Sequence, residues 1–166
     1  MIWNLFKRKK GNQALVERQY AEITAAARSP VFYESMGVPD TVMGRFEMIS
    51  VHLFLYLRRT GSAGDAARGL AQELVDAFFE DVDHSIRELG IGDMGVPKRM
   101  KKLAKMFYGR VTSYSLALDA GDNQALTDAL KRNIHPESGD DAPPMQALSD
   151  WMIATAHSLE DVDDET

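Results

Sequence analysis

Residues 76–118, DAFFEDVDHSIRELGIGDMGVPKRMKKLAKMFYGRVTSYSLAL, decide the fold that we expect for this chain. They contain two helical patterns that meet at a glycine-rich elbow over residues 90–96. The first pattern carries an acidic stripe at three- and four-residue steps, made of Glu73, Asp76, Glu80 and Asp83. The second carries bases and no acid, namely Lys98, Arg99, Lys101, Lys102, Lys105 and Arg110. Like charges at these steps cost about 0.2–0.5 kcal/mol per pair, so we expect each stripe to have a partner elsewhere.

The partner of each stripe is open to two interpretations. The basic pattern has an apolar seam for packing on another helix, at positions 100, 104, 107, 111, 114 and 118. If the elbow makes the helices antiparallel, the stripes pair with each other through Glu88–Lys98, Asp83–Lys102, Asp81–Lys105 and Asp76–Arg110. Exposed pairs contribute about 0–1 kcal/mol each, so they would set the register of the hairpin more than its stability. Alternatively, a surplus basic face docks a partner protein, RNA or lipid.

The composition fits a single domain without covalent cross-links. At 166 residues the chain can bury roughly 70% of its unfolded surface. The absence of cysteine excludes disulfides, thiolate metal sites and cysteine catalysis. The longest apolar run, residues 53–57, is far shorter than the roughly 20 residues that cross a bilayer, and no secretory signal is visible. These features predict a cytoplasmic protein.

The net charge of −6 hides an asymmetry along the chain. Residues 137–166 contain nine acids and no Lys or Arg, whereas residues 1–136 contain 16 acids and 19 bases. The body is therefore mildly basic and the C-terminal end is acidic. We expect three parts: a basic and aromatic N-terminal segment over residues 1–12, a helical domain over residues 13–159, and an acidic tail over residues 160–166.

The N-terminal segment MIWNLFKRKK combines large apolar side chains with consecutive bases. Apolar groups can enter the interface of a bilayer while cations meet anionic lipid headgroups, so this pattern predicts reversible contact with a membrane surface. The residues expected to make this contact are Trp3, Phe6, Lys7, Arg8, Lys9 and Lys10. Two other interpretations stay open: a disordered terminus, or a segment whose Trp3 and Phe6 fold back onto the core.

The whole chain predicts an all-α, single-domain bundle of about seven helices, because no segment alternates apolar and polar residues between hairpin turns. Asn12, Asp40, Asp65 and Asp122 precede periodic apolar runs and are expected to be helix N-caps. Gly37 suits a left-handed turn. The expected helices cover residues 12–28, 30–35, 41–60, 66–89, 97–119, 123–134 and 145–159, and the helix at 41–60 is expected to be central.

Three blocks of residues do more than specify helices. The first is FYxxxGVPDTxxGRF at residues 32–46, and the second is DxDHSxRExGxGD at residues 81–93. The third comprises KRMKK at 98–102, FYGR at 107–110 and Arg132-Asn133. In content and order these blocks resemble the ubiquinol–cytochrome c chaperone family, assembly factors for the cytochrome bc complex (complex III). The resemblance covers roughly residues 18–134, most of the chain.

The resemblance implies a non-catalytic assembly chaperone that binds cytochrome b, or a small partner protein bound to it. Mitochondrial members hold newly made apocytochrome b near the membrane until haem insertion and assembly proceed. No mitochondrial-type presequence is visible, so the chain is similar to a short bacterial member. We expect it in the cytoplasm, as a peripheral protein at the inner face of the cytoplasmic membrane.

Part of the matched blocks is expected to rim an apolar groove that accepts a helix of the client. The candidate client- or partner-binding residues are Phe32, Tyr33, Val38, Pro39, Arg45, Phe46, Arg87, Asp93, Lys98, Lys102, Phe107, Tyr108 and Arg110. The aromatic residues can instead be plain core, and the arginines buried forks that hold carboxylates or carbonyls. Gly44 and Gly109 lie inside helical patterns at a cost of about 1 kcal/mol each, which favours close helix–helix approach there.

Other functions have weaker support in the sequence. His84 follows Glu80 and Asp81 at steps that could seat a metal, but a bridged di-metal bundle needs a second such helix, so we expect a structural histidine, no metal and no cofactor. Haem binding by His52 or His84 is a minor alternative. No phosphate-binding loop, nucleophile elbow or zincin pair is present. The rival function is a nucleic-acid module that uses residues 97–110, although the acids and the weak net charge make nucleic acid an unlikely partner.

Overall fold

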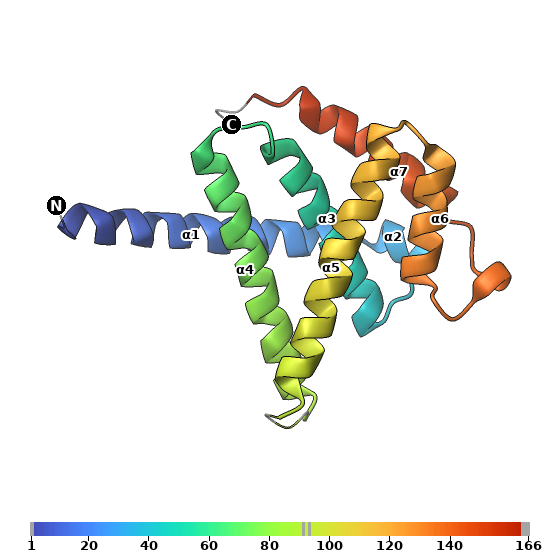
Figure 1. The fold of residues 1–166 in the computed structure, drawn as a ribbon, viewed down its shortest axis with the longest axis horizontal. Helices are drawn as coiled ribbons and strands as arrows, with labels where there is room; N and C mark the ends of the chain where they lie inside the picture. The colour runs from blue at the N-terminus through green and yellow to red at the C-terminus, as the bar shows by residue number, and fades with distance from the viewer. Residues whose placement is uncertain (1, 91, 93, 164–166) are drawn as a thin grey trace.

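The computed structural model describes residues 2–90, 92 and 94–163, with side chains from residue 12 onward. Within that part of the chain every regular element is helical (Figure 1). The elements are α1 (Ile2–Ala27), α2 (Pro30–Glu34), α3 (Val42–Thr60), α4 (Asp65–Glu88), α5 (Val96–Asp119), α6 (Asn123–Ile134), the 3-10 turn η1 (Gly139–Asp141) and α7 (Gln146–Glu160). The prediction of an all-α bundle of about seven helices is confirmed.

Helix α3 is the centre of the bundle and packs against α1, α4, α5, α6 and α7. Apart from the half-buried His52, its residues 46–55 are buried. Aromatic rings join it to its neighbours: Phe46 lies 5.4 Å from Phe78 of α4, and Phe54 lies 5.5 Å from Tyr114 of α5, between ring centroids. Such ring pairs add about 0.5–1.5 kcal/mol beyond the area that they bury. The apolar run of α3 is therefore the core on which the other helices are placed.

The N-cap of α3 is Thr41, and the prediction of Asp40 is wrong by one residue. Thr41 has an extended backbone, so its Oγ1 lies over the first turn and accepts the N–H of Gly44 at 3.0 Å. Asp40 instead accepts two hydrogen bonds from the guanidinium of Arg45, at 2.9 and 3.2 Å. Both residue types are good caps, and the local backbone decides between them.

Two other helix starts differ from the expectation, and one agrees. Helix α1 begins at Ile2 and runs through Asn12, so Asn12 lies inside the helix and is not its N-cap. Gly64 is the N-cap residue of α4, and Asp65 is the first helical residue, where its carboxylate favours the helix dipole and pairs with Arg68. Asp122 caps α6 as predicted, accepting the N–H of Ala125 at 2.9 Å.

Helices α4 and α5 form the expected hairpin, but apolar packing rather than charge holds it. None of the four predicted ion pairs between the stripes forms among the described residues. Asp76 accepts from Gln72, Asp81 from Tyr20, and Asp83 from Arg87, whereas Arg110 pairs with Glu47 of α3. The hairpin packs through the rings of Phe78, Phe79 and Phe107. The charged residues of the two stripes therefore bind other partners or are exposed to solvent.

Two glycines that the sequence marked as close-approach positions differ sharply. A Cβ on Gly44 would lie 1.8 Å from the carbonyl oxygen of Pro39, so the loop before α3 crosses the helix where only a glycine fits. A Cβ on Gly109 would meet nothing within 4 Å. The prediction of close helix–helix approach is therefore wrong at both positions within the described fold: at Gly44 the close neighbour is the loop before α3, and at Gly109 there is none. As predicted, Gly37 adopts a left-handed conformation, with φ of 74°.

Candidate functional site

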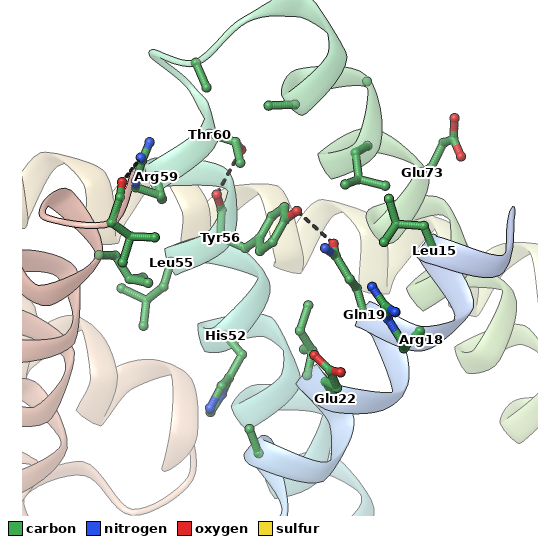
Figure 2. Close-up of a pocket in the computed structure, with 18 of the residues that line it drawn as sticks. Leu15, Arg18, Gln19, Glu22, His52, Leu55, Tyr56, Arg59, Thr60 and Glu73 are labelled. Carbon is green, nitrogen blue, oxygen red and sulfur yellow. Dashed lines mark hydrogen bonds between the residues drawn. The ribbon is translucent and has the colours of Figure 1, made fainter. Parts of the chain in front are cut away.

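An open apolar groove lies between α1, α3, the start of α4, and α7, with a volume of about 930 Å³ (Figure 2). Each helix contributes apolar side chains to its lining. They include Leu15, Ile23, Leu55, Tyr56, Leu70, Trp151 and Leu159. We call this feature the four-helix groove. Apolar side chains of several helices converge in it, which makes it the first candidate for binding an apolar segment.

The groove exists because the start of α4 has small side chains. Residues 63–71 read AGDAARGLA, and Ala63, Ala66, Ala67 and Gly69 line the groove. A Cβ on Gly69 would meet nothing within 4 Å. Larger residues at these positions would occupy the space between α4 and α1, so the small residues leave the hollow. This run of small residues is the sequence signal that would have located the groove.

Polar groups hold the walls of the four-helix groove together. The Tyr56 hydroxyl donates to Oε1 of Gln19 at 2.9 Å and links α3 to α1 (Figure 2). Burial raises the pKa of the Tyr56 phenol, which therefore stays neutral. About one turn further along α3, Arg59 donates to the backbone carbonyl of Val162 and connects the segment after α7 to α3. These contacts fix the width of the groove between helices that are distant in the sequence.

A cluster of three rings forms the end wall of the groove. His52 and Trp151 line it, with ring centroids 5.2 Å apart, and Phe32 packs behind both at 5.5 and 4.7 Å. His52 Nδ1 lies 2.8 Å from the Met48 carbonyl oxygen, so Nδ1 carries the proton and donates. Burial lowers the pKa of His52, and the imidazole is therefore neutral in the folded chain. Phe32 supports the groove from behind instead of rimming it.

We expect the fold to lose stability as the pH falls below about 6.5, the usual pKa of histidine. Burial lowers the pKa of His52 in the folded chain. The imidazole therefore binds a proton more readily in the unfolded chain than in the folded chain, and acid favours unfolding. The contribution of His52 is fully present above the usual pKa. It is lost as the pH falls toward the lowered folded value, by at most about 1.4 kcal/mol per pH unit.

Urea unfolding at about pH 7.5 and about pH 5.5 measures this dependence. The matched control is His52→Phe, which keeps a ring in the cluster but removes the titrating group. The variant should lose less stability on acidification than the parent chain. An equal loss in both proteins would show that His52 does not cause the dependence.

Arg110, a predicted site residue, is a buried anchor. Its guanidinium donates to both carboxylate oxygens of Glu47, at 2.7 and 2.5 Å, and the two side chains are 9% and 3% exposed. It also donates to the carbonyls of Met106 and Asn133, at 3.1 and 3.4 Å. Burial raises the pKa of Glu47, and the hydrogen bonds and charge of Arg110 oppose that effect. The pair joins α3, α5 and α6.

Sequence reasoning missed Glu47, although a signal was present. Glu47 is an acid inside the apolar run of α3, and no other acid occurs in residues 48–64. An isolated acid on an apolar helix needs a buried cation or a proton. Arg110 of α5 is that cation. It lies 63 residues from Glu47 in the sequence, so the pairing was not visible from the sequence alone.

The other predicted site residues divide by exposure. Phe32, Val38, Phe46 and Phe107 are buried in the core. Tyr33 and Pro39 are half-buried: the Tyr33 hydroxyl donates to the Ala27 carbonyl at 2.9 Å, and the Pro39 carbonyl lies against Gly44 of α3. The exposed residues are Arg45, Arg87, Lys98, Lys102 and Tyr108. The first matched block therefore builds the turn before α3, and it does not contribute side chains to the four-helix groove.

Some predicted residues fall outside what the structure describes. Asp93 is one of them. For Trp3, Phe6 and the bases at 7–10, only the helical backbone of α1 is described, so their membrane contact stays a prediction. Within the described residues, no helix has both the length and the hydropathy that spanning a bilayer requires.

The metal hypothesis has no geometric support in the described residues, where no three His, Asp or Glu side chains form a ligand cluster. Asp81 instead accepts a hydrogen bond from the Tyr20 hydroxyl at 2.7 Å, which links α4 to α1. Burial and the neighbouring Asp81 carboxylate raise the pKa of Tyr20. His84 is exposed on the surface of α4.

Comparison with known proteins places this geometry in a family. The crystal structure of the Cbp3 homolog from Brucella abortus is similar, with 54% sequence identity, a TM-score of 0.87, and coverage of 99% of this chain and 91% of that chain. Ubiquinol-cytochrome-c reductase complex assembly factor 1 from Xenopus laevis is 25% identical over 134 residues, which are 81% of this chain and 66% of that protein.

A second assembly factor, from Mus musculus, is 21% identical over 148 residues, which are 89% of this chain and 50% of that protein. The chain thus spans between about half and just under two thirds of the length of these curated relatives. Residues 34–166 match the family model described as Ubiquinol-cytochrome C chaperone, which extends through the acidic C-terminal end. With four fifths of its length matched, the chain belongs to the ubiquinol-cytochrome C chaperone family.

Proposed function

We propose that this chain is a non-catalytic assembly chaperone of ubiquinol–cytochrome c reductase that holds an apolar helix of cytochrome b in the four-helix groove. The observation that carries the proposal is the open apolar groove between α1, α3, α4 and α7. Its relatives are named as assembly factors of that complex, which supports a component of the complex as the client. Cytochrome b is the client that the resemblance of the matched sequence blocks implies.

The size of the groove suits part of a helix. A helix with its side chains is about 10–12 Å wide and rises 1.5 Å per residue. A volume of about 930 Å³ therefore accommodates roughly two turns of such a helix. Two turns present apolar residues at positions i, i+3, i+4 and i+7, the pattern of helix-in-groove recognition. The groove would cover one stripe of a client helix and leave the rest to other partners.

The chemistry of the lining fits reversible holding. Apolar side chains lie along the floor, while Arg18, Glu22 and Glu73 stand at the edges (Figure 2). An apolar centre with a polar rim is the usual anatomy of a protein interface. The helix-interior Gly69 costs about 1 kcal/mol relative to alanine, and the fold gains no packing from it. Space kept open for a client explains that cost.

The position of α1 supports delivery of the client from a membrane surface. The same helix that lines the groove with Leu15 and Ile23 continues without a break to Ile2 and extends beyond the bundle (Figure 1). Its first turns carry Trp3, Phe6 and the bases at 7–10. We propose that these residues contact the lipid surface and hold the groove near the bilayer into which cytochrome b inserts.

Filling the groove is expected to abolish client holding without unfolding the chain. In Gly69→Phe, the ring enters a space where even a Cβ meets nothing within 4 Å, so it blocks the groove without disturbing the core. Capture of cytochrome b from solubilised membranes should fall at least about tenfold, which corresponds to about 1.4 kcal/mol. Cells that carry only this variant should lose complex III while other respiratory complexes stay at normal levels.

Gly69→Ala is the matched control, because a methyl group leaves most of the groove open and should preserve capture. Thermal unfolding of both variants checks that the fold is intact. Normal cytochrome b capture and normal complex III with a folded Gly69→Phe protein would remove the groove from the proposal. Loss of complex III with both variants would point to a role of α4 other than client holding.

A further inference from the structure

The outer face of α5 is a second surface, separate from the four-helix groove. Helical periodicity places residues 98, 101, 102, 105, 109, 112 and 116 along one side of this helix, over about 27 Å. All these residues are exposed, and Leu116 is 67% exposed. No residue of α5 lines the groove, so the two surfaces can be occupied at the same time.

The first half of this face carries four lysines. Lys98, Lys101, Lys102 and Lys105 make no ion pair with any described residue. In contrast, five arginines of the bundle have a carboxylate partner: Arg45 with Asp40, Arg58 with Asp119, Arg68 with Asp65, Arg87 with Asp83, and Arg110 with Glu47. The lysines of α5 therefore offer an unused positive field to something outside the chain.

Gly109 lies just beyond the lysines, in the middle of the same face. Glycine is the least favourable residue in a helix interior apart from proline. Among the residues that the structure describes, nothing lies within 4 Å of where its Cβ would be, so their packing does not require the missing side chain. Gly44 shows the opposite case, since its own loop fills that space. A bare stretch of helix at Gly109 is suited to close approach by another backbone.

We propose that the outer face of α5 docks an acidic helix of a partner protein. Its carboxylates would meet the lysines at 98–105, and its backbone would cross α5 at Gly109. Tyr108, half-exposed with its ring 6.3 Å from Phe79, and Leu116 supply apolar contacts on either side of the crossing.

Gly109 is the feature that favours an acidic protein helix over other negatively charged ligands. A bilayer surface or a phosphate backbone would be attracted by the lysines, but neither requires a missing side chain at Gly109. Small residues at a crossing point let two helix backbones approach closely, whereas a side chain there holds them apart. The combination of lysines and an open glycine thus favours a protein helix.

The proposal is tested with the full chain in cells that carry a photo-crosslinking amino acid, p-benzoylphenylalanine, at Thr112 on this face. The control position is Gln124, which is exposed on α6. The expected result is one protein adduct at Thr112, with a crosslinked peptide that is acidic and helical. Gly109→Leu and the double variant Lys101→Glu/Lys102→Glu should each reduce the adduct at least about tenfold.

The remaining outcomes decide against the proposal. No adduct at Thr112, an adduct with RNA, lipid or a second copy of this chain, or an adduct unaffected by Gly109→Leu would each overturn it, as would the same adduct from Gln124. Because nothing lies within 4 Å of a Cβ at Gly109, the Gly109→Leu variant is expected to fold. Thermal unfolding of the variant checks this expectation. The groove variant Gly69→Phe should keep the adduct, so failure of this surface and failure of the groove are distinguishable.

Discussion

Replacing Arg110 with leucine is expected to lower the free energy of unfolding by about 3–5 kcal/mol. The substitution removes both hydrogen bonds to Glu47, at 2.7 and 2.5 Å, and leaves a carboxylate that is 3% exposed without its cation. The carbonyl of Asn133 on α6 also loses a donor. A buried charge without a partner is among the few causes of so large an effect from one substitution. Urea unfolding at about pH 7.5 measures it.

The loss should depend on pH in a defined direction. Burial already raises the pKa of Glu47, and Arg110 opposes that effect. Without Arg110 only burial remains, so the pKa of Glu47 rises further in the folded variant. Between the unfolded and the raised folded pKa, the folded chain binds more protons than the unfolded chain, so stability falls as the pH rises. The deficit of Arg110→Leu should therefore be smaller at about pH 5 than at about pH 7.5.

The double variant Glu47→Leu/Arg110→Leu distinguishes a stranded charge from lost packing. Replacing a buried ion pair by apolar residues of similar volume is often neutral, so the double variant should recover most of the loss. Lys101→Ala, on the exposed side of the same helix, should change stability by no more than about 0.5 kcal/mol. A double variant as unstable as Arg110→Leu would mean that the stranded carboxylate is not the cause.

This result bears on how the third matched block is interpreted. Arg110 belongs to the FYGR stretch, yet it joins three helices from inside the core. If an Arg110 variant lowers the level of complex III, the cause would therefore be an unstable fold and not the loss of a contact with the client. Variants of Lys102 or Tyr108, which are exposed, test contacts more directly.

Local features of the fold could be predicted from the sequence because their causes lie within a few residues. Asp122 caps α6 through an N–H only three residues away, and Gly37 takes a left-handed turn whatever surrounds it. The choice of Thr41 over Asp40 depends on the path of the loop, so it required the structure. A cap could therefore be predicted where its acceptor and donor lie within one turn, as at Asp122, whereas the starts of α1, α3 and α4 differ from the prediction.

The partners of charges and the place of the groove could not be predicted in the same way. The sequence shows that Arg110 is a base beside an acidic stripe, but its carboxylate lies 63 residues earlier. The four-helix groove depends on four helices from both ends of the chain, and its clearest local sign is the run of small residues near Gly69. Several carboxylates in the sequence could pair with Arg110 equally well by chemistry alone. Only the packing of the helices in three dimensions determines that the partner is Glu47.

Replacing Gly44 with alanine is expected to destabilise the chain by about 1–3 kcal/mol, and Gly109→Ala to stabilise it by up to about 1 kcal/mol. The new Cβ at Gly44 would lie 1.8 Å from the Pro39 carbonyl oxygen and 2.9 Å from its carbonyl carbon. Both atoms are backbone, so the loop itself has to move. At Gly109 the same methyl group meets nothing and gains the better helix propensity of alanine.

The loop before α3 cannot move freely, which is why the cost at Gly44 should be high. Val38 is 2% exposed, and its N–H donates to the Phe32 carbonyl at 3.2 Å. Displacing Pro39 would pull Val38 from the core and weaken the cap that Thr41 forms on α3. Urea unfolding and thermal midpoints of the two alanine variants, measured side by side, give effects of opposite sign. If Gly44→Ala changes stability by less than about 0.5 kcal/mol, the loop is more compliant than its buried anchor implies.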